Sequence, residues 1–188
     1  MNRRELLKMI TAVTGTALIG SAAVGLSGCA TSAPVAGALS FTAGDIALMD
    51  EIAETILPRT DTPGAKDAEV GKFMAVYVAD CYTLEQQAIF YKGLQALEDS
   101  CQKTYNRSFM ALNQTERQEL LTQLDQEARG RIGRGAEPHY FTMLKQLTLL
   151  GFFTSEAGAT QVLRHVPIPG RYDGALPYKP GDRAWATS

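Results

Sequence analysis

Residues able to bind metals or redox cofactors are scarce in this sequence of 188 residues. It contains two histidines, His139 and His165, and three cysteines. The cysteines form no haem-attachment motif, and their spacing suits neither zinc nor an iron–sulfur cluster. The glycines of GRIGRG follow a predicted helix, whereas a phosphate-binding loop follows a strand. We therefore predict neither a metal site nor a cofactor site in this chain.

The sequence also lacks an excess of positive charge. Its formal net charge is −2, and without residues 1–28 it has 15 basic and 19 acidic residues. A surface that binds the phosphate backbone of DNA or RNA usually needs the opposite balance. We interpret the basic cluster of Arg129, Arg131 and Arg134 as a solvated loop, and we predict no nucleic-acid partner.

No catalytic motif stands out either. Ser155, His165 and Asp173 could in principle form a hydrolytic triad. However, Ser155 lies outside any GxSxG nucleophile elbow, and the capping of a helix fully accounts for this serine. We therefore predict no catalytic residue in the chain.

The N-terminus has the features of an export signal. Residues 1–8 are charged and include the pair Arg3 and Arg4, and residues 9–26 are apolar. Their threonine, glycine and serine content makes this run too weakly hydrophobic for a stable membrane span. Paired arginines at this place are typical of the bacterial Tat pathway, which carries folded proteins. Ordinary Sec export is the alternative.

The apolar run ends in Leu26-Ser27-Gly28-Cys29, which resembles the lipobox of bacterial lipoproteins. In a lipobox the cysteine is acylated and the chain is cut just before it. The alternative is an unmodified Cys29 near a conventional cleavage site. We predict a signal peptide at residues 1–28, a flexible tether at 29–41 and a helical domain at 42–188, held in the periplasm by a lipid anchor in the membrane.

The spacing of apolar residues predicts an all-α fold, a small bundle of about five to six helices. Thr42 and Asp45 form a capping-box pattern at the start of the first helix, and Pro58 ends it. The stretch from Pro58 to Val70 is rich in residues that favour loops. A second helix carries Val70, Phe73, Met74, Tyr77 and Cys81.

Three longer helices and a short one follow. The third begins at Thr83, with Gln86 at the capping-box position, and its expected apolar face is Leu84, Ala88, Tyr91, Leu94, Leu97, Cys101 and Tyr105. Asn113 and Glu116 open the fourth, which buries Leu120, Leu121 and Leu124. Pro138 suits the first turn of the fifth. Ser155 is expected to cap the sixth, which ends near His165.

Cys81 and Cys101 are predicted to be two buried, unpaired thiols. A continuous third helix would separate them by about 27 Å along its axis, at 1.5 Å per residue. A disulfide requires Cα atoms within about 7 Å, so pairing would need a break in the helix, for which Gly93 is the candidate.

The C-terminal residues 166–188 cannot form a helix, because they contain four prolines and three glycines. They also contain Tyr172, Tyr178 and Trp185, which are costly to expose to water. We interpret this segment as an extended Pro/Gly-rich arm whose aromatic side chains pack on the helical core or on a partner.

Three segments together resemble the gluconate 2-dehydrogenase subunit 3 family. They are AETILPRTDTPGAKDAEV, YKGLQALEDSCQKTYNRSFMALNQTERQELL and GFFTSEAGATQVLRHVPIPGRYDG. The most specific pieces are PRTDTPGA at Pro58–Ala65, GFFTSE at Gly151–Glu156 and the later PIPG. The resemblance extends over residues 42–188 and does not include the lipobox, which is inferred from the sequence alone.

This resemblance implies a cofactor-free, non-catalytic small subunit of a membrane-associated dehydrogenase complex. The implied partners are an FAD-dependent catalytic subunit of the glucose–methanol–choline type and a possible multihaem cytochrome c that carries haem c. In this family the small subunit commonly carries the Tat signal while the flavoprotein has none, so the small subunit would escort its partner. The expected substrate is gluconate, another sugar or an alcohol.

The residues that we expect to contact the flavoprotein lie in the motifs and in the arm: Pro58, Pro63, Gly64, Phe152, Tyr172, Tyr178 and Trp185. A different class of function is the alternative. The chain could be a stand-alone periplasmic lipoprotein that binds a small ligand or supports the envelope.

Overall fold

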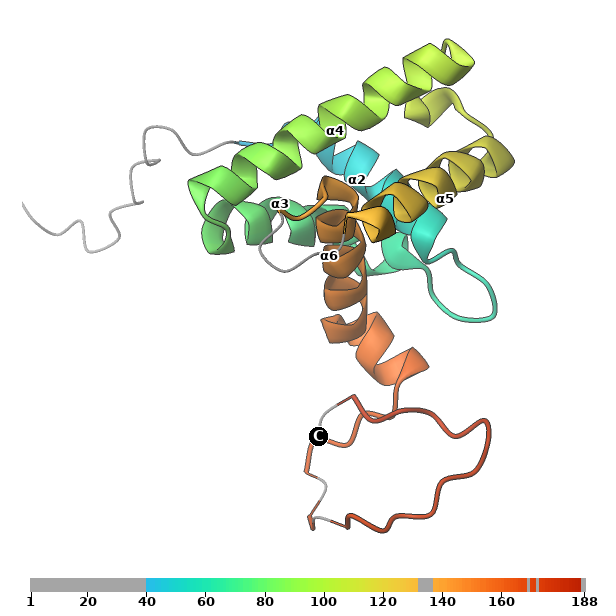
Figure 1. Ribbon diagram of the computed structural model, residues 1–188. Helices are drawn as coiled ribbons and strands as arrows, with labels where there is room; N and C mark the ends of the chain where they lie inside the picture. Colours follow the sequence, from blue (N-terminus) through green and yellow to red (C-terminus); the bar gives the residue numbers. More distant parts are fainter. Residues whose placement is uncertain (1–39, 132–136, 169, 172, 187–188) are drawn as a thin grey trace, which may run out of the picture. The chain divides into compact units, whose positions relative to one another are not determined.

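A computed structural model describes residues 40–131, 137–168, 170–171 and 173–186. All of them belong to the unit formed by Ala38–Ser188. The predicted signal peptide, with Arg3 and Arg4, and Cys29 lie outside the described residues. The described part is mostly α-helical and contains no β-strand, which confirms the all-α prediction (Figure 1).

Three helices begin at the capping boxes that the sequence predicts. They are α2 (Ala43–Ile56), α4 (Leu84–Tyr105) and α5 (Gln114–Gly130). In α2, the Thr42 hydroxyl accepts from the Asp45 amide at 3.2 Å, and the Asp45 carboxylate accepts from the Thr42 amide at 2.8 Å. Each box therefore pairs two of the amides that a helix start leaves free. Helix α2 ends at Ile56 because a residue before proline disfavours helical backbone angles, and Leu57 precedes Pro58.

The second predicted helix is also present, as α3 (Val70–Cys81). A 3₁₀ turn, η1 (Ala65–Ala68), precedes it, and Glu69 between the two has a left-handed backbone. Cys81 is the last residue of α3 and is exposed, whereas Cys101 is buried and both thiols are unpaired. The prediction of two buried thiols is therefore wrong for Cys81, because the end of α3 lies outside the packed core.

Helix α4 runs through Gly93 without a break, but its buried face differs from the predicted one. Leu84 is 69% exposed, and the first buried positions are Gln87 and Phe90. Counting back from Cys101 in steps of three or four gives Leu97, Leu94, Phe90 and Gln87 on one face. The predicted series shares Leu94, Leu97 and Cys101 with this face. Earlier in the helix it named Ala88 and Tyr91, each one residue after the buried Gln87 and Phe90. Gln87 is accommodated because its amide donates to two carbonyls at the end of α3, those of Ala79 and Tyr82, at 3.1 Å each.

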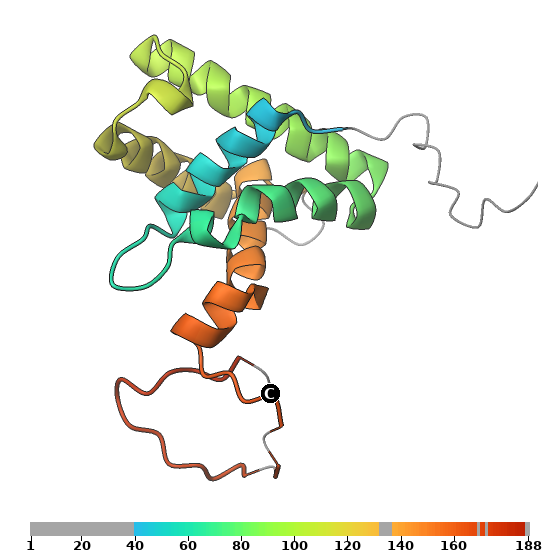
Figure 2. The same cartoon turned by 180° about the vertical axis from the view of Figure 1, so that it is seen from behind.

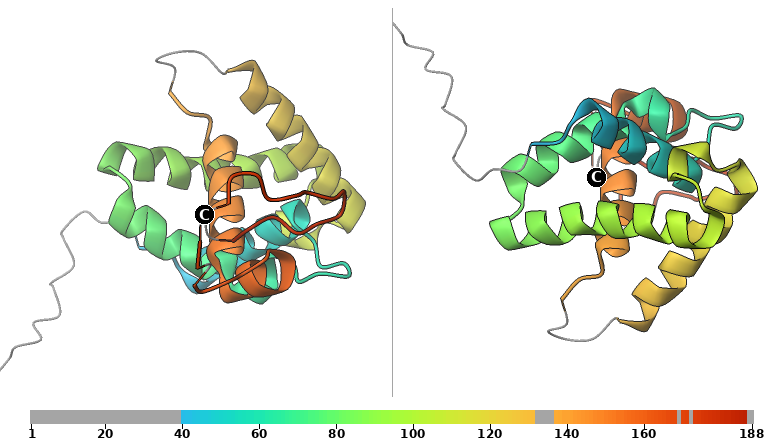
Figure 3. Two further views of the ribbon diagram at one scale, coloured as in Figure 1. Left: turned by 90° about the horizontal axis from the view of Figure 1, so that it is seen from below. Right: turned by 90° about the horizontal axis from the view of Figure 1, so that it is seen from above.

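Helix α6 (Tyr140–Thr154) is the central element of the bundle. It packs against α2, α3, α4 and α5, and its buried residues lie on about half of its circumference, at about 100° per residue. Figure 3 views the bundle along α6, and Figure 2 shows its continuation into the C-terminal segment from behind. His139 is its N-cap, so Pro138 stands just before the helix. The prediction that Pro138 lies in the first turn is therefore wrong.

The short sixth helix is largely a π-helix, η3 (Gly158–Val162), and it ends three residues before His165. Ser155 stands between α6 and this helix, as predicted. Another short 3₁₀ turn, η2 (Phe109–Ala111), joins α4 to α5. The largest fully buried side chains come from α2, α3, α4, η2 and α6 and include Met49, Ile52, Met74, Phe90, Leu97, Phe109 and Leu144.

Candidate partner-binding surface

The loop between α2 and η1 contains the PRTDTPGA motif and is organised by a carboxylate of α2. Glu54 accepts hydrogen bonds from the amides of Arg59, at 2.9 Å, and Lys66, at 2.8 Å. The Ala65 amide donates to the carbonyl of Leu57 at 2.9 Å and closes the loop at its base. These bonds fix a segment that has no regular secondary structure of its own, so that the exposed residues 58–62 are presented as a tip.

Gly64 is essential to this arrangement because no side chain fits at its position. A Cβ atom there would lie 2.5 Å from the Arg59 amide nitrogen and 2.5 Å from a Glu54 carboxylate oxygen. The Gly64 amide donates to Asp67 at 2.7 Å, and Asp67 also forms an ion pair with Arg59. The glycine thus allows Glu54 and Asp67 to hold the two sides of one loop.

A second carboxylate, Glu51, joins this region to α5. It forms ion pairs with Lys66 and with Arg117, and the Glu51 and Arg117 side chains are each only 16% exposed. Burial acts to raise the pKa of Glu51, but the hydrogen bond from Lys66 and the charge of Arg117 outweigh it and bring the pKa below its ordinary value. Glu51 is therefore ionised at neutral pH and connects η1, α2 and α5.

Backbone hydrogen bonds join the two ends of the C-terminal segment. The Arg164 amide donates to the Ala184 carbonyl at 2.7 Å, and the Ala186 amide donates to the Arg164 carbonyl at 3.0 Å. The Arg164 guanidinium lies over the Trp185 ring, 4.1 Å from its centroid. This cation–π contact and the two hydrogen bonds make residues 164–186 a closed loop, which we call the C-terminal loop (Figure 1).

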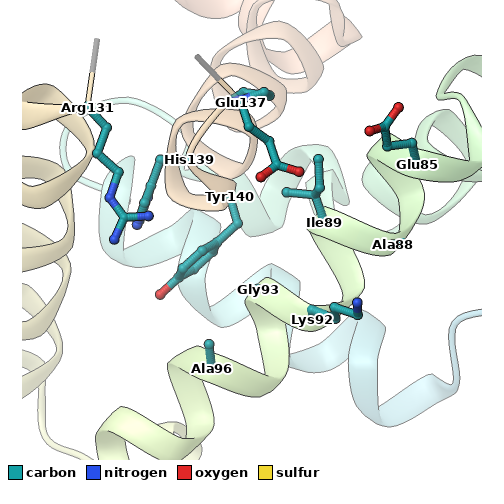
Figure 4. Close-up of a pocket in the computed structure, with 11 residues that line it drawn as sticks. Glu85, Ala88, Ile89, Lys92, Gly93, Ala96, Arg131, Glu137, His139 and Tyr140 are labelled. Atoms are coloured by element: carbon teal, nitrogen blue, oxygen red, sulfur yellow. The ribbon is translucent and has the colours of Figure 1, made fainter. Parts of the chain in front are cut away.

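A hollow of about 440 Å³ lies between α4 and the start of α6 (Figure 4). Tyr140 lies over Gly93, where a Cβ atom would be 2.3 Å from the tyrosine side chain. Burial raises the pKa of Tyr140 to about 12. His139 is used by the fold, because its Nδ1 accepts from the Phe141 amide at 3.2 Å, and burial lowers its pKa. These groups account for the packing of α6 on α4 and form no catalytic pair.

Ser155 has the structural role that its sequence context indicates. Its hydroxyl donates to the Phe152 carbonyl at 2.6 Å and accepts from the Gly158 amide at 3.0 Å. Among the described residues, no group of three or more His, Cys, Asp or Glu side chains is placed to hold a metal ion. In the same part of the chain, every helix is too short or too polar to span a membrane.

The residues expected to contact a partner differ in their exposure to solvent. Pro58, Tyr178 and Trp185 are exposed, and Pro63 is half-buried. Gly64 and Phe152 are buried within this chain, so they support the neighbouring surface and offer little of it themselves. Tyr172 lies outside the described residues.

The model of one protein family covers most of the described bundle. It is the family described as gluconate 2-dehydrogenase subunit 3, and it matches residues 43–170. The chain belongs to the gluconate 2-dehydrogenase subunit 3 family. This confirms the resemblance seen in the sequence. Membership of this family implies that the chain is an accessory subunit. Comparisons with curated proteins and with solved structures gave no match.

Three residues that organise the candidate surface were not predicted from the sequence. Glu54 and Asp67 resemble any other charged residues near a loop, and only the fold shows that backbone amides point at them. Arg164 pairs with a tryptophan 21 positions later, which no local pattern reveals. In this gluconate 2-dehydrogenase subunit 3, tertiary contacts identify these residues, and no sequence signal does.

Proposed function

We propose that this chain is the non-catalytic small subunit of a periplasmic dehydrogenase complex. Its partner is an FAD-dependent subunit of the glucose–methanol–choline type that oxidises gluconate, another sugar or an alcohol. The observation that carries the proposal is the family match over residues 43–170, in a chain that begins with the twin arginines Arg3 and Arg4. A multihaem cytochrome c is a possible third subunit, which accepts the electrons.

In this proposal the small subunit escorts the flavoprotein through the Tat pathway. A flavoprotein folds around its flavin in the cytoplasm, and the Tat pathway accepts folded cargo. A flavoprotein without a signal of its own can therefore cross while it is bound to this chain. Acylation of Cys29 then anchors the complex to a membrane. Binding must survive transport, which requires an interface of substantial area.

The rival reading, a stand-alone lipoprotein, has less support. A ligand-binding lipoprotein needs a concave, largely apolar pocket with a few converging polar groups. The hollow beside α6 is lined by charged residues such as Glu85, Lys92 and Glu137 and is open to solvent. The PRTDTPGA loop, in contrast, presents exposed side chains on a backbone held by hydrogen bonds to Glu54. The C-terminal loop presents exposed side chains between two ends that are joined by hydrogen bonds, as expected of a docking surface.

Export provides the test. The small subunit and a flavoprotein of the glucose–methanol–choline type from the same cells are produced together, with Arg3 and Arg4 either intact or both changed to lysine. The double substitution should retain both proteins in the cytoplasm and abolish dye reduction by the periplasmic fraction. Full flavoprotein activity in the periplasm of cells that lack the small subunit would refute the escort role. The purified small subunit alone should show no flavin absorbance.

A further inference from the structure

We propose that the C-terminal loop is a preformed docking element for the dehydrogenase subunit, held in its binding conformation by the Arg164–Trp185 contact. The inference rests on the proposed function and adds the part of the surface that recognises the partner. It also gives Arg164, which no motif singled out, a positioning role.

The C-terminal loop is shaped before any partner binds. Lys179-Pro180-Gly181-Asp182 forms a type II turn pattern, with proline second and Gly181 third at φ +94°, and the Asp182 amide donates to the Lys179 carbonyl at 2.9 Å. The Asp182 carboxylate also accepts from the Lys179 amide, at 2.8 Å. A second turn starts at Asp173, whose carboxylate accepts from the Ala175 amide at 3.2 Å. Ordering a loop in advance lowers the entropy that binding must overcome.

This ordered loop exposes apolar side chains that its own bundle does not cover. Ile168 is 84% exposed, Tyr178 is 74% exposed and Leu176 is 45% exposed. Burying such side chains contributes about 25 cal/mol for each Å² removed from water. A protein partner that covers them therefore gains free energy without a large rearrangement of the loop.

The charge of the loop indicates what kind of surface it fits. Residues 164–186 contain four basic and two acidic residues, a net charge of +2, whereas residues 42–163 contain 11 basic and 17 acidic residues, a net charge of −6. The loop thus carries the opposite sign to the bundle from which it extends. We infer that its partner surface combines apolar pockets with an acidic rim.

A protein surface fits this loop better than a lipid surface. Among the described residues between His165 and Arg183, two backbone–backbone hydrogen bonds are formed inside the loop. Most of its amides and carbonyls thus need water or a partner to bond with. The hydrocarbon core of a bilayer cannot supply those bonds, and unpaired backbone groups are costly there. A protein can supply them together with the apolar contacts.

The first experiment measures binding of the full chain to the flavoprotein. Leu176→Ser combined with Tyr178→Ser should weaken the complex by about tenfold or more, as expected for exposed anchor residues. Val76→Ser combined with Leu84→Ser is the matched control, because these side chains are 61% and 69% exposed on α3 and α4. The control should bind within about twofold of the wild type. Equal binding by both double variants would overturn the docking loop. Failure of the wild-type chain to bind would instead overturn the proposed function.

The second experiment uses Trp185, the single tryptophan of the sequence, as a probe of loop closure. Arg164→Gln removes the cation–π contact, so it should increase acrylamide quenching of the Trp185 fluorescence and weaken flavoprotein binding. Arg164→Lys keeps the charge and should restore both in part. If Arg164→Gln leaves both readouts unchanged, Arg164 does not position the loop.

The third experiment tests the lipid alternative. The Cys29→Ala chain, which has no anchor, is mixed with vesicles that contain phosphatidylglycerol. We expect no flotation with the vesicles, and no difference between this chain and the same chain carrying Leu176→Ser and Tyr178→Ser. Flotation that depends on Leu176 and Tyr178 would overturn the choice of a protein partner.

Discussion

The guanidinium of Arg117 on α5 forms an ion pair with the carboxylate of Glu51 on α2, 66 positions earlier in the chain. Glu51 also forms an ion pair with Lys66, so one carboxylate joins α2, α5 and the residue that follows the PRTDTPGA loop. Both side chains of the Arg117 pair are mostly buried, which limits screening by water. This pair is therefore a place where pH and stability should be coupled.

Glu51→Gln is expected to destabilise the protein by about 1–3 kcal/mol at neutral pH, because Arg117 and Lys66 lose a charged partner. The folded-state pKa of Glu51 lies below its ordinary value of 4.5. Its stabilisation is thus complete above that value and is lost as the pH falls through the folded-state pKa. The difference between wild type and variant should shrink in that acidic range. Urea unfolding at several pH values measures it.

The control for this prediction is Glu69→Gln, which removes the partner of Lys72. Both side chains of that pair are more than 60% exposed. Exposed pairs contribute little to stability, so unfolding of this variant should match the wild type. An unchanged difference between wild type and Glu51→Gln down to pH 2 would show that the carboxylate is not coupled to folding.

Helix starts were predictable here because their signals are local. The three capping boxes lie within four residues each, and all three appear at the predicted positions. The face of α4 was harder, because the choice between Phe90 and Tyr91 depends on which side meets α6. Leu84 shows the limit of the pattern: it continues an apolar series but lies at the first residue of the helix, and it remains exposed.

The candidate surface was predictable only as a set of motifs. The sequence indicated the PRTDTPGA loop, yet it could not separate exposed Pro58 from buried Gly64. That distinction depends on Glu54, which reaches the loop from α2 through the fold. The closure of the C-terminal loop by Arg164 and Trp185 is likewise a tertiary contact. Local patterns carry no information about either relationship.

Gly64→Ala should destabilise the protein by about 1–3 kcal/mol, because the added methyl group meets the Glu54 carboxylate and the Arg59 backbone. It should also weaken flavoprotein binding if the loop tip takes part in docking. Thermal unfolding and co-purification measure the two effects. Gly130→Ala is the control, since nothing lies within 4 Å of a Cβ atom there, and its stability should be unchanged or higher by up to about 1 kcal/mol. Equal stability of both variants would contradict the close approach of Glu54 to Gly64.

The two thiols of the bundle should react at different rates. Cys81 is exposed at the end of α3, whereas Cys101 is buried and burial raises its pKa to about 11. Iodoacetamide at pH 8 should therefore modify Cys81 in the folded protein and leave Cys101 unmodified, because the thiolate is the reactive form. Peptide masses locate the modification. In guanidinium chloride both thiols should react, and labelling of Cys101 before Cys81 in the folded state would contradict the structure.

Processing at Cys29 yields the last prediction. The sequence Leu26-Ser27-Gly28-Cys29 predicts a mature chain that begins at Cys29 and carries acyl chains. Intact-mass measurement of the protein extracted from membranes should show this lipid, and Cys29→Ala should move the small subunit, with its bound flavoprotein, into the soluble fraction. Cys81→Ala is the matched control, because it removes an exposed thiol elsewhere and should leave the membrane association intact. Acyl chains bind a membrane through the burial of their CH₂ groups, so their loss should release the protein whatever its other contacts with the flavoprotein. An unmodified mass that starts at another residue would refute lipidation at Cys29.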